Sequence, residues 1–218
     1  MRHFRNLCDL QADDQVLDIG CGVGRIAIPL TQFLSMQGSY DGFDIVPDAI
    51  RWCQKEVTDR YPNFRFEVAN IYNKNYHPTG KIKGSEYQFN FPNTTFDLAI
   101  ATSLFTHLLP ADLVNYVSEA ARVLKKDGRC LFTFYLWNSE AQELAEAGKA
   151  KVAFPFEFDV YRSKDAKWRE EGIAYHEGYV RDVLSSAGFE IEGEIQYGAW
   201  SGRKEYLSHQ DIIVLRKR

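Results

Sequence analysis

Three glycines and two acids in the first fifth of the chain have the spacing of a ligand-binding turn. The stretch VLDIGCGVGR places Gly20, Gly22 and Gly24 directly after an apolar run that contains Asp18. A glycine-rich turn after a buried strand brings the backbone close to a ligand. Asp44 ends a second apolar run, SYDGFDI, where a carboxylate can accept hydrogen bonds from a ribose diol. The candidate ligands are a dinucleotide, a nucleoside triphosphate and a nucleoside without phosphate.

The same stretch disfavours a phosphate ligand. No Lys-Ser or Lys-Thr pair follows the glycines, so the phosphate cradle of a P-loop is excluded. A dinucleotide pattern that starts at Gly20 has Arg25 in place of its third glycine, and one that starts at Gly22 begins too late. Asp18 would repel a pyrophosphate but attract an ammonium group. These observations favour a phosphate-free nucleoside with an amine, and the alternative is that Asp18 only orders the turn through backbone N–H groups.

Alternating strand and helix patterns surround these residues. Apolar runs typical of buried parallel strands occur at QVLDIG, SYDGFDI, NFRFEVAN, TTFDLAIAT and RCLFTFYL. Helices are predicted from Ile26 to Leu34 and over PADLVNYVSEAARVLKKDG, which ends on Gly128 as a stop signal. FEIEGEIQY and HQDIIVLRK are joined too closely for a crossover helix, so they should be antiparallel. We predict an α/β fold, a three-layer Rossmann-like sandwich around a seven-stranded, mostly parallel sheet with an antiparallel last strand.

Two segments interrupt this alternation. Residues 71–94 are rich in Asn, Gly and Pro where a crossover helix is expected, so we predict an extended loop or a small hairpin. Residues 137–176 hold a short amphipathic helix, SEAQELAEAGKA, and then an aromatic stretch of mixed charge, which is too long for a connector. We therefore predict a single domain over residues 1–218 with a small cap insertion at 137–176.

The composition excludes several classes of function. With 26 Lys and Arg against 30 Asp and Glu, the net charge is −4, so there is no overall attraction to nucleic acid or to an anionic membrane. The four cysteines lack CxxC spacing, which predicts reduced thiols in a cytoplasmic protein. No His, Asp and Glu cluster has metal-ligand spacing, and no apolar run is long enough to span a membrane. We expect a monomer or a homodimer without metal, membrane or nucleic-acid partners.

Taken together, these segments resemble the class I S-adenosylmethionine-dependent methyltransferases. The first motif of that family is acid-x-Gly-x-Gly-x-Gly, which VLDIGCGVGR matches. GFDI, VANIYN, FDLAIATSLFTHL and ARVLKKDGRCLFTFY resemble the later motifs in order. The resemblance implies methyltransferase activity with S-adenosylmethionine as cofactor. It also implies these cofactor-binding residues: Asp18, Gly20, Cys21, Gly22, Gly24, Asp44, Ile45, Asn70, Ile71, Thr102 and Ser103.

The family's motifs imply a role for each part of this set. The glycine turn and Asp18 would hold the methionine part of the cofactor, and Asp44 would bind the ribose hydroxyls. Asn70 stands where the family commonly receives the adenine amino group, with Ile45 and Ile71 as apolar walls. The Thr-Ser pair after the fourth strand would lie near the sulfonium. Family members often cover the site with a longer N-terminal segment, so either the cap does this here or the chain is short.

The acceptor is less constrained than the cofactor. The Asn/Asp-Pro-Pro-aromatic motif of exocyclic-amine DNA methyltransferases is absent after the fourth strand, where ATSL stands. This absence and the acidic composition favour a small-molecule acceptor, with a hydroxyl oxygen as nucleophile. Two other functions stay open: a nicotinamide-dependent oxidoreductase, which would use the late glycine pattern, and a non-catalytic subunit that binds S-adenosylmethionine.

Three histidines are candidate catalytic bases. His107 follows the fourth strand, His176 precedes a late helix, and His209 begins the last strand beside an aromatic loop. Each has a simpler interpretation. His107 could be a scaffold residue bonded to the backbone, His176 a surface residue at a helix start, and His209 part of a surface loop.

Overall fold

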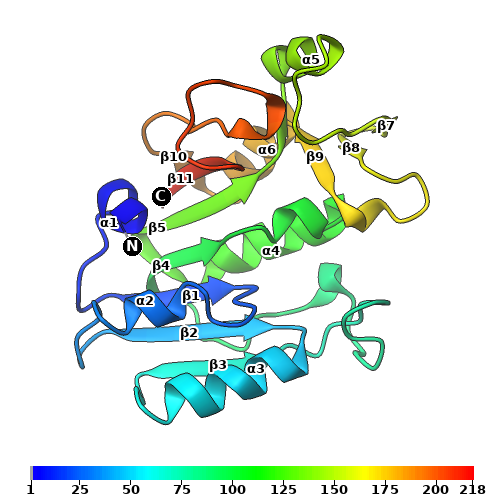
Figure 1. Cartoon of the computed structure of the whole chain (residues 1–218). Coiled ribbons are helices and arrows are strands. Elements are labelled where there is room, and N and C mark those ends of the chain that lie inside the picture. The colour runs from blue at the N-terminus through cyan, green and yellow to red at the C-terminus, as the bar shows by residue number, and fades with distance from the viewer. Residues whose placement is uncertain (1) are drawn as a thin grey trace.

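A seven-stranded sheet forms the centre of the molecule, with the strand order β10-β11-β5-β4-β1-β2-β3 (Figure 1). The computed structural model describes the backbone of residues 2–218 and the side chains from residue 5 onward. The strands are β1 (Gln15–Ile19), β2 (Ser39–Asp44), β3 (Phe64–Val68), β4 (Phe96–Ala101), β5 (Leu124–Phe134), β10 (Phe189–Ile191) and β11 (Asp211–Lys217).

The pairing of these strands confirms the predicted fold class. β1, β2 and β3 are parallel to one another, and β4 and β5 continue in the same direction. β11 is antiparallel to both of its neighbours, β5 and β10, so the last strand is the reversed one. Because β1 and β4 are adjacent and parallel, the loops that follow them meet at one edge of the sheet.

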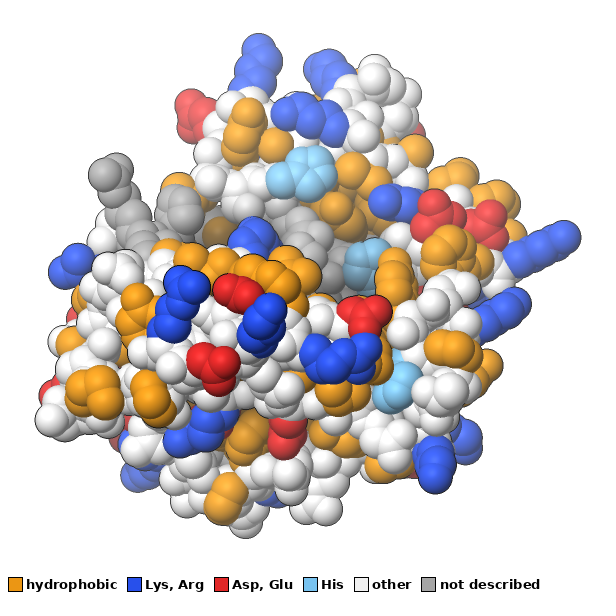
Figure 2. Space-filling view, turned by 60° about the horizontal axis from the view of Figure 1, so that its bottom comes forward, with side chains coloured by type: hydrophobic (Ala, Val, Ile, Leu, Met, Phe, Trp, Pro, Cys, Tyr) orange, Lys and Arg blue, Asp and Glu red, His pale blue; other side chains and the backbone are white. Residues whose placement is uncertain are grey.

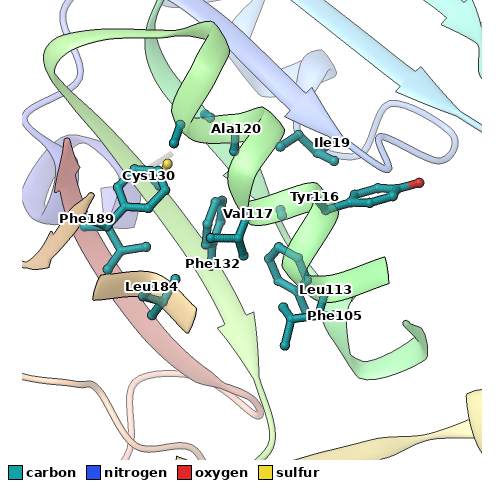
Figure 3. Close-up of a cluster of buried hydrophobic side chains, with 14 of the residues drawn as sticks. Ile19, Phe105, Leu113, Tyr116, Val117, Ala120, Cys130, Phe132, Leu184 and Phe189 are labelled. Carbon is teal, nitrogen blue, oxygen red and sulfur yellow. The ribbon is translucent and has the colours of Figure 1, made fainter. Parts of the chain in front are cut away.

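Helices cover both faces of the sheet and complete the three layers. On one face Val117 of α4 and Leu184 of α6 pack with Phe132 of β5 (Figure 3). On the other face Ile50 of α3 lies in a second cluster with Val16 of β1. The helices are α1 (Arg2–Cys8), α2 (Ala27–Leu30), α3 (Pro47–Cys53), α4 (Pro110–Val123), α5 (Ser139–Glu146) and α6 (Glu177–Ser186). A π-helical turn, η1 (Gln54–Thr58), continues α3, and the 3₁₀ turns are η2 (Gly84–Glu86), η3 (Phe105–His107), η4 (Arg169–Glu171) and η5 (Ala199–Ser201).

The helices α2 and α4 end earlier than the sequence predicts. α2 ends at Leu30 instead of Leu34, and the N–H of Ser35 donates to the carbonyl of Ala12, which returns the chain to the sheet. α4 ends at Val123 and not at Gly128, because Leu124 already has an extended backbone and pairs with β4. Leu124 is fully buried in this position, so the gain from strand pairing exceeds the helix propensity of the two lysines that follow.

Residues 137–176 leave the main sheet and build most of a second sheet, with the strand order β6-β9-β8-β7. β6 follows β5 after one intervening residue, Tyr135, and pairs in parallel with β9. The predicted amphipathic helix is present as α5, and the side chain of Asn138 caps it by accepting the N–H of Ala141 at 2.9 Å. The strands are β6 (Leu136–Trp137), β7 (Phe156–Glu157), β8 (Tyr161–Ser163) and β9 (Ile173–His176).

The predicted loop at residues 71–94 is confirmed. It contains a narrow hairpin in which Asn73 and His77 pair, and a parallel bridge joins Ile71 to Ile82. In Figure 1 this segment lies beyond the arrowheads of β1 and β2, on the same side as the loop between β8 and β9. Over residues 2–218, no helix has the length and apolar character that crossing a bilayer requires.

Candidate functional site

The glycine turn after β1 is held against the end of β2. The N–H groups of Gly20 and Cys21 donate to the carbonyl of Phe43 at 2.9 and 3.0 Å. Gly20, Gly22 and Gly24 have φ angles of 78°, 54° and 71°, a left-handed conformation that favours glycine. A Cβ at Gly20 would also lie 3.1 Å from the side chain of Leu104. The turn therefore requires glycine for its backbone shape and, at Gly20, for close approach.

Asp44, at the end of β2, connects the glycine turn to the start of α3. Its Oδ2 accepts the N–H of Gly22 at 2.9 Å, and its Oδ1 accepts the N–H of Val46 at 2.9 Å. Each carboxylate oxygen has a second lone pair, and the half-buried side chain lines a cavity. Asp44 can therefore accept ligand hydroxyls while it holds the turn in place.

A cavity with several acids opens at the ends of β1 and β2, and we call it the acidic cavity. It consists of two adjoining hollows that share Gly20, Asp44, Leu104 and His107. Ile45 and Ile71 form apolar walls, and Lys74 is its basic residue. The acids that line it are Asp44, Asp112, Glu170 and Glu171.

A second cavity, which we call the basic cavity, lies at the ends of β4 and β5 beside the start of β11. Its volume of about 520 Å³ is within the range of small-molecule sites. Its charged or ionisable side chains are Arg25, Tyr135 and His209, and no Asp or Glu is among its lining residues within the described part of the chain. Thr102 and Ser103 line both cavities, so the two spaces meet at the turn after β4. Figure 2 shows a hollow on one face of the molecule with histidine side chains at its edge.

A chain of polar side chains fixes the turn between the cavities. The N–H of Ser103 donates to Thr133 Oγ1 at 2.8 Å, and Thr133 donates to Gln210 Oε1 at 2.8 Å. The hydroxyl of Ser103 donates to the same Gln210 oxygen at 3.0 Å. Ser103 keeps a left-handed φ of 58°, which costs free energy for a residue with a Cβ. Because Gln210 accepts two hydroxyls through its oxygen, its amide N–H groups remain available to a ligand.

Asp211 anchors the loop that carries His209. Its carboxylate is fully buried and accepts the N–H of Gly198 at 2.6 Å, the N–H of Leu136 at 2.7 Å and the indole N–H of Trp200 at 2.8 Å. Burial raises the pKa of Asp211 to about 6, although these three donors lower it. The start of β11, the loop before it and β6 are thus joined through one side chain.

Asp18 lies beneath the glycine turn, on the α2 and α3 face of the sheet. The side chain is 1% exposed, and its Oδ2 accepts the hydroxyl of Tyr40 at 2.6 Å. Its Oδ1 has no partner among the residues that the structure describes. Burial raises the pKa of Asp18 to about 7. The alternation of β1 side chains places Asp18 in this interior, outside the lining of both cavities.

The remaining predicted cofactor residues divide into two groups. Ile45, Ile71, Thr102 and Ser103 line the cavities. Cys21 is buried, and burial raises the pKa of its thiol. Asn70 is exposed outside both linings, and its Oδ1 accepts the N–H of Lys81 at 3.2 Å.

The three candidate histidines lie in three different places. His107 lines the acidic cavity, and its Nδ1 lies 2.8 Å from the carbonyl of Glu170. A carbonyl only accepts, so Nδ1 is the donor in this contact. His209 lines the basic cavity, with its ring edge-on to Tyr135. His176 is outside both linings, and its Nε2 is buried without a partner in the described region.

Several cavity residues were missed by the sequence analysis. Arg25 directly follows the third glycine, so its position in the motif was an available signal. Thr133, Gln210 and Tyr116 had no local signal, because only the sheet order brings them to the site. Tyr116 belongs to α4, and its hydroxyl points away from the hydrophobic cluster (Figure 3) and lines the acidic cavity. In residues 5–218 no group of His, Cys, Asp or Glu has the arrangement of a metal site.

A family model described as a methyltransferase domain matches residues 16–128. An aklanonic acid methyltransferase of a Streptomyces species is 30% identical over 132 residues, which cover 59% of this chain and 53% of that protein. A sterol 24-C-methyltransferase of Candida albicans is 27% identical over 191 residues, which cover 84% and 42%. The chain thus spans about half the length of the curated relatives that it matches.

Solved structures share the fold. An S-adenosylmethionine-dependent methyltransferase of Methanosarcina mazei has a TM-score of 0.63 at 24% identity, covering 95% of this chain and 94% of that one. A protein of Pyrococcus horikoshii has a TM-score of 0.67 at 20% identity, with 100% and 87% covered. A magnesium protoporphyrin IX methyltransferase of Synechocystis, with S-adenosylhomocysteine bound, has a TM-score of 0.58 at 19% identity, with 94% and 74% covered.

Proposed function

We propose that this chain, which belongs to the class I S-adenosylmethionine-dependent methyltransferase family and takes S-adenosylmethionine as its cofactor, transfers a methyl group to a hydroxyl oxygen of a small molecule. The observation that carries the proposal is the pair of cavities that meet at Thr102 and Ser103. One cavity has the features of a nucleoside site, and the other has room for a separate small molecule.

The residues that line the acidic cavity support its assignment to the cofactor. Asp44 has free lone pairs for the ribose hydroxyls, and Ile45 and Ile71 offer apolar walls for the adenine. When bound, S-adenosylmethionine supplies a methyl group on a positively charged sulfur. The acids that line the cavity favour such a cation, and the left-handed glycines leave open space at Gly22 for close approach of a ligand to the backbone.

The basic cavity is the proposed acceptor site. Its walls include Leu131 and Ile212, which would exclude water, and Ser103 and Gln210 offer polar groups that would orient an acceptor. His209 is the histidine on this side, and it would accept the proton that a hydroxyl acceptor releases. His107 would act differently, because its bond to Glu170 ties the 3₁₀ turn after β4 to the loop that precedes β9.

The names of the relatives support a small-molecule acceptor. Aklanonic acid, a sterol and magnesium protoporphyrin IX are each named, and none of them is a nucleic acid. We further propose that residues 137–176 act as a cap within a single domain, because Trp168 and Glu170 from this segment line the acidic cavity. The proposed cytoplasmic location rests on the four buried cysteines, which form no disulfide.

The proposal is tested with S-adenosylmethionine that carries a labelled methyl group. The chain is incubated with the labelled cofactor and a metabolite extract, and label is sought in a small molecule at an oxygen atom. In parallel, calorimetry compares S-adenosylhomocysteine with NADH. Binding of NADH alone would contradict the cofactor assignment. Cofactor binding without label in any extract would favour the non-catalytic alternative.

His209 and His176 form a matched pair for the proton-acceptor role. With a labelled acceptor in hand, His209→Gln should lower turnover by roughly 100-fold, because a positioned general base contributes about that much. His176→Gln should leave turnover unchanged, since His176 lies outside both cavities. Affinity for S-adenosylhomocysteine should be the same in both variants. Equal turnover in the two variants would remove His209 from this role.

A further inference from the structure

We propose that the acceptor is a carboxylic acid and that Arg25 binds its carboxylate in the basic cavity. The inference rests on the proposed function, because it assumes that the acceptor occupies this cavity. It adds the chemical class of the acceptor and the residue that selects it.

Arg25 has donors that its surroundings do not use. Its one hydrogen bond to a described residue is a long one, 3.4 Å from Nη2 to Thr102 Oγ1. Among the residues that the structure describes, no carboxylate lies within ion-pair distance of the guanidinium. A guanidinium has five N–H donors in a planar fork that matches a carboxylate in bidentate geometry. Arg25 is therefore an open anion-binding group at the edge of the cavity.

The rest of the basic cavity suits a singly charged organic acid. The other polar side chains of this lining are hydroxyls, the amide of Gln210 and the imidazole of His209, so Arg25 is the one Lys or Arg among the described lining residues. Ile26, Leu131 and Ile212 add apolar wall area, which favours a carbon skeleton attached to the anion.

The two cavities are complementary in charge. Asp44, Glu170 and Glu171 line the space that suits a cationic cofactor, while the adjoining space has no acid among its described lining residues and has Arg25 at its edge. An anionic acceptor is attracted to a sulfonium and is repelled from the acids of the cofactor cavity. The charges of the two cavities therefore favour binding of the cationic cofactor in the acidic cavity and of the anionic acceptor in the basic cavity.

A rival source of the same carboxylate is the methionine part of the cofactor. Thr102, which Arg25 contacts, lines both cavities, so the guanidinium is close to the boundary. The two sources differ in one measurable respect. If the cofactor supplies the carboxylate, loss of Arg25 lowers the affinity for the cofactor. If the acceptor supplies it, loss of Arg25 lowers only the affinity for an added acid.

The experiment uses protein saturated with S-adenosylhomocysteine at pH 8, where an ordinary histidine is neutral. Ligand-observed NMR measures the affinity of matched pairs: benzoate and benzamide, 4-hydroxybenzoate and 4-hydroxybenzamide, hexanoate and hexanamide. We expect at least one acid to bind about tenfold more tightly than its amide. Arg25→Gln should abolish this preference, and Arg25→Lys should retain part of it. Arg60→Gln is the control, since it removes an exposed arginine beside Glu56, outside both cavity linings.

The outcomes separate this proposal from the proposed function. If wild-type protein shows no preference for any acid, or if Arg25→Gln keeps the preference, the acceptor assignment is wrong. If Arg25→Gln instead lowers the affinity for S-adenosylhomocysteine tenfold or more, Arg25 binds the cofactor and not the acceptor. If S-adenosylhomocysteine fails to bind wild-type protein, the proposed function fails first.

Discussion

The acidic and basic cavities share a boundary, but they are assembled in different ways. In the acidic cavity the polar groups proposed for the cofactor, Gly20 and Asp44, belong to one turn and the end of the next strand, although the rest of its lining comes from distant segments such as α4 and η4. The basic cavity takes Arg25, Ser103, Tyr135 and His209 from four separate parts of the chain. A short motif can therefore place the central polar groups of one site, whereas the whole lining of the other depends on the topology of the sheet.

The largest effect that we expect is on the acidic cavity. Asp44→Ala removes the acceptor for the N–H groups of Gly22 and Val46 and the group proposed to bind the ribose hydroxyls, so affinity for S-adenosylhomocysteine should fall roughly 100-fold. Calorimetry measures the change. Asp48→Ala is the matched control, because Asp48 is an exposed acid in the first turn of α3 that pairs with Arg51. A similar loss in both variants would mean that overall charge, and not the Asp44 contacts, governs binding.

The anchor of the basic cavity gives the next effect. Asp211→Asn places an amide N–H₂ group where the carboxylate accepted from Gly198, Leu136 and Trp200, so one buried donor loses its acceptor. The free energy of unfolding at pH 8 should fall by about 2 to 3 kcal/mol in urea denaturation. Asp182→Asn, at an exposed position on α6, should change it little. Wild-type stability in Asp211→Asn would show that the loop before β11 is held by other contacts.

Asp18 provides a test by pH. Its pKa is raised to about 7 in the folded chain from about 3.9 in the unfolded chain, so the folded state keeps a proton that the unfolded state loses. Stability therefore rises as the pH falls from 8 to 5.5, by about 2 kcal/mol for this group. Asp18→Asn should remove that part of the pH dependence while its side-chain oxygen still accepts from Tyr40. Identical pH profiles for the two proteins would contradict the buried environment of Asp18.

The smallest effect compares two glycines. Gly22→Ala and Gly148→Ala each force a residue with a Cβ into a left-handed conformation, with no atom within 4 Å of the new carbon. Each should lose about 1 kcal/mol of stability in urea denaturation. Only Gly22→Ala should also lower the affinity for S-adenosylhomocysteine, because Gly22 belongs to the turn that Asp44 holds. Equal affinities in both variants would show that the cofactor does not approach this part of the turn.

The sequence predicted the strands and the glycine turn because their signals are local. Each central strand is buried on both faces, so it appears as a continuous apolar run. The predicted end of α4 was wrong because the pairing between β5 and β4 begins at Leu124, a contact that no local pattern shows. The acidic end of β2 has a local signal of the same kind, and Asp44 lines the acidic cavity.

The directions of side chains were harder to predict. Asp18 is part of the recognised motif, but strand alternation turns it into the interior beside Tyr40. His176 precedes α6 as expected, but its ring is packed away from both cavities. Gln210 lines the basic cavity because β11 lies next to β5. This pairing joins strands far apart in the chain, so no local pattern predicts it.

The pairing of β6 with β9 has a consequence for how this protein could change over time. Leu136 lies opposite Tyr175, and Trp137 lies opposite His176, so the chain departs for the second sheet and returns at adjacent positions. A segment whose two ends are neighbours can lengthen, shorten or be exchanged for another while the strands that flank it keep their places. The part that contributes Trp168 and Glu170 to the acidic cavity can therefore vary in length and sequence while the glycine turn on the other side of that cavity stays intact.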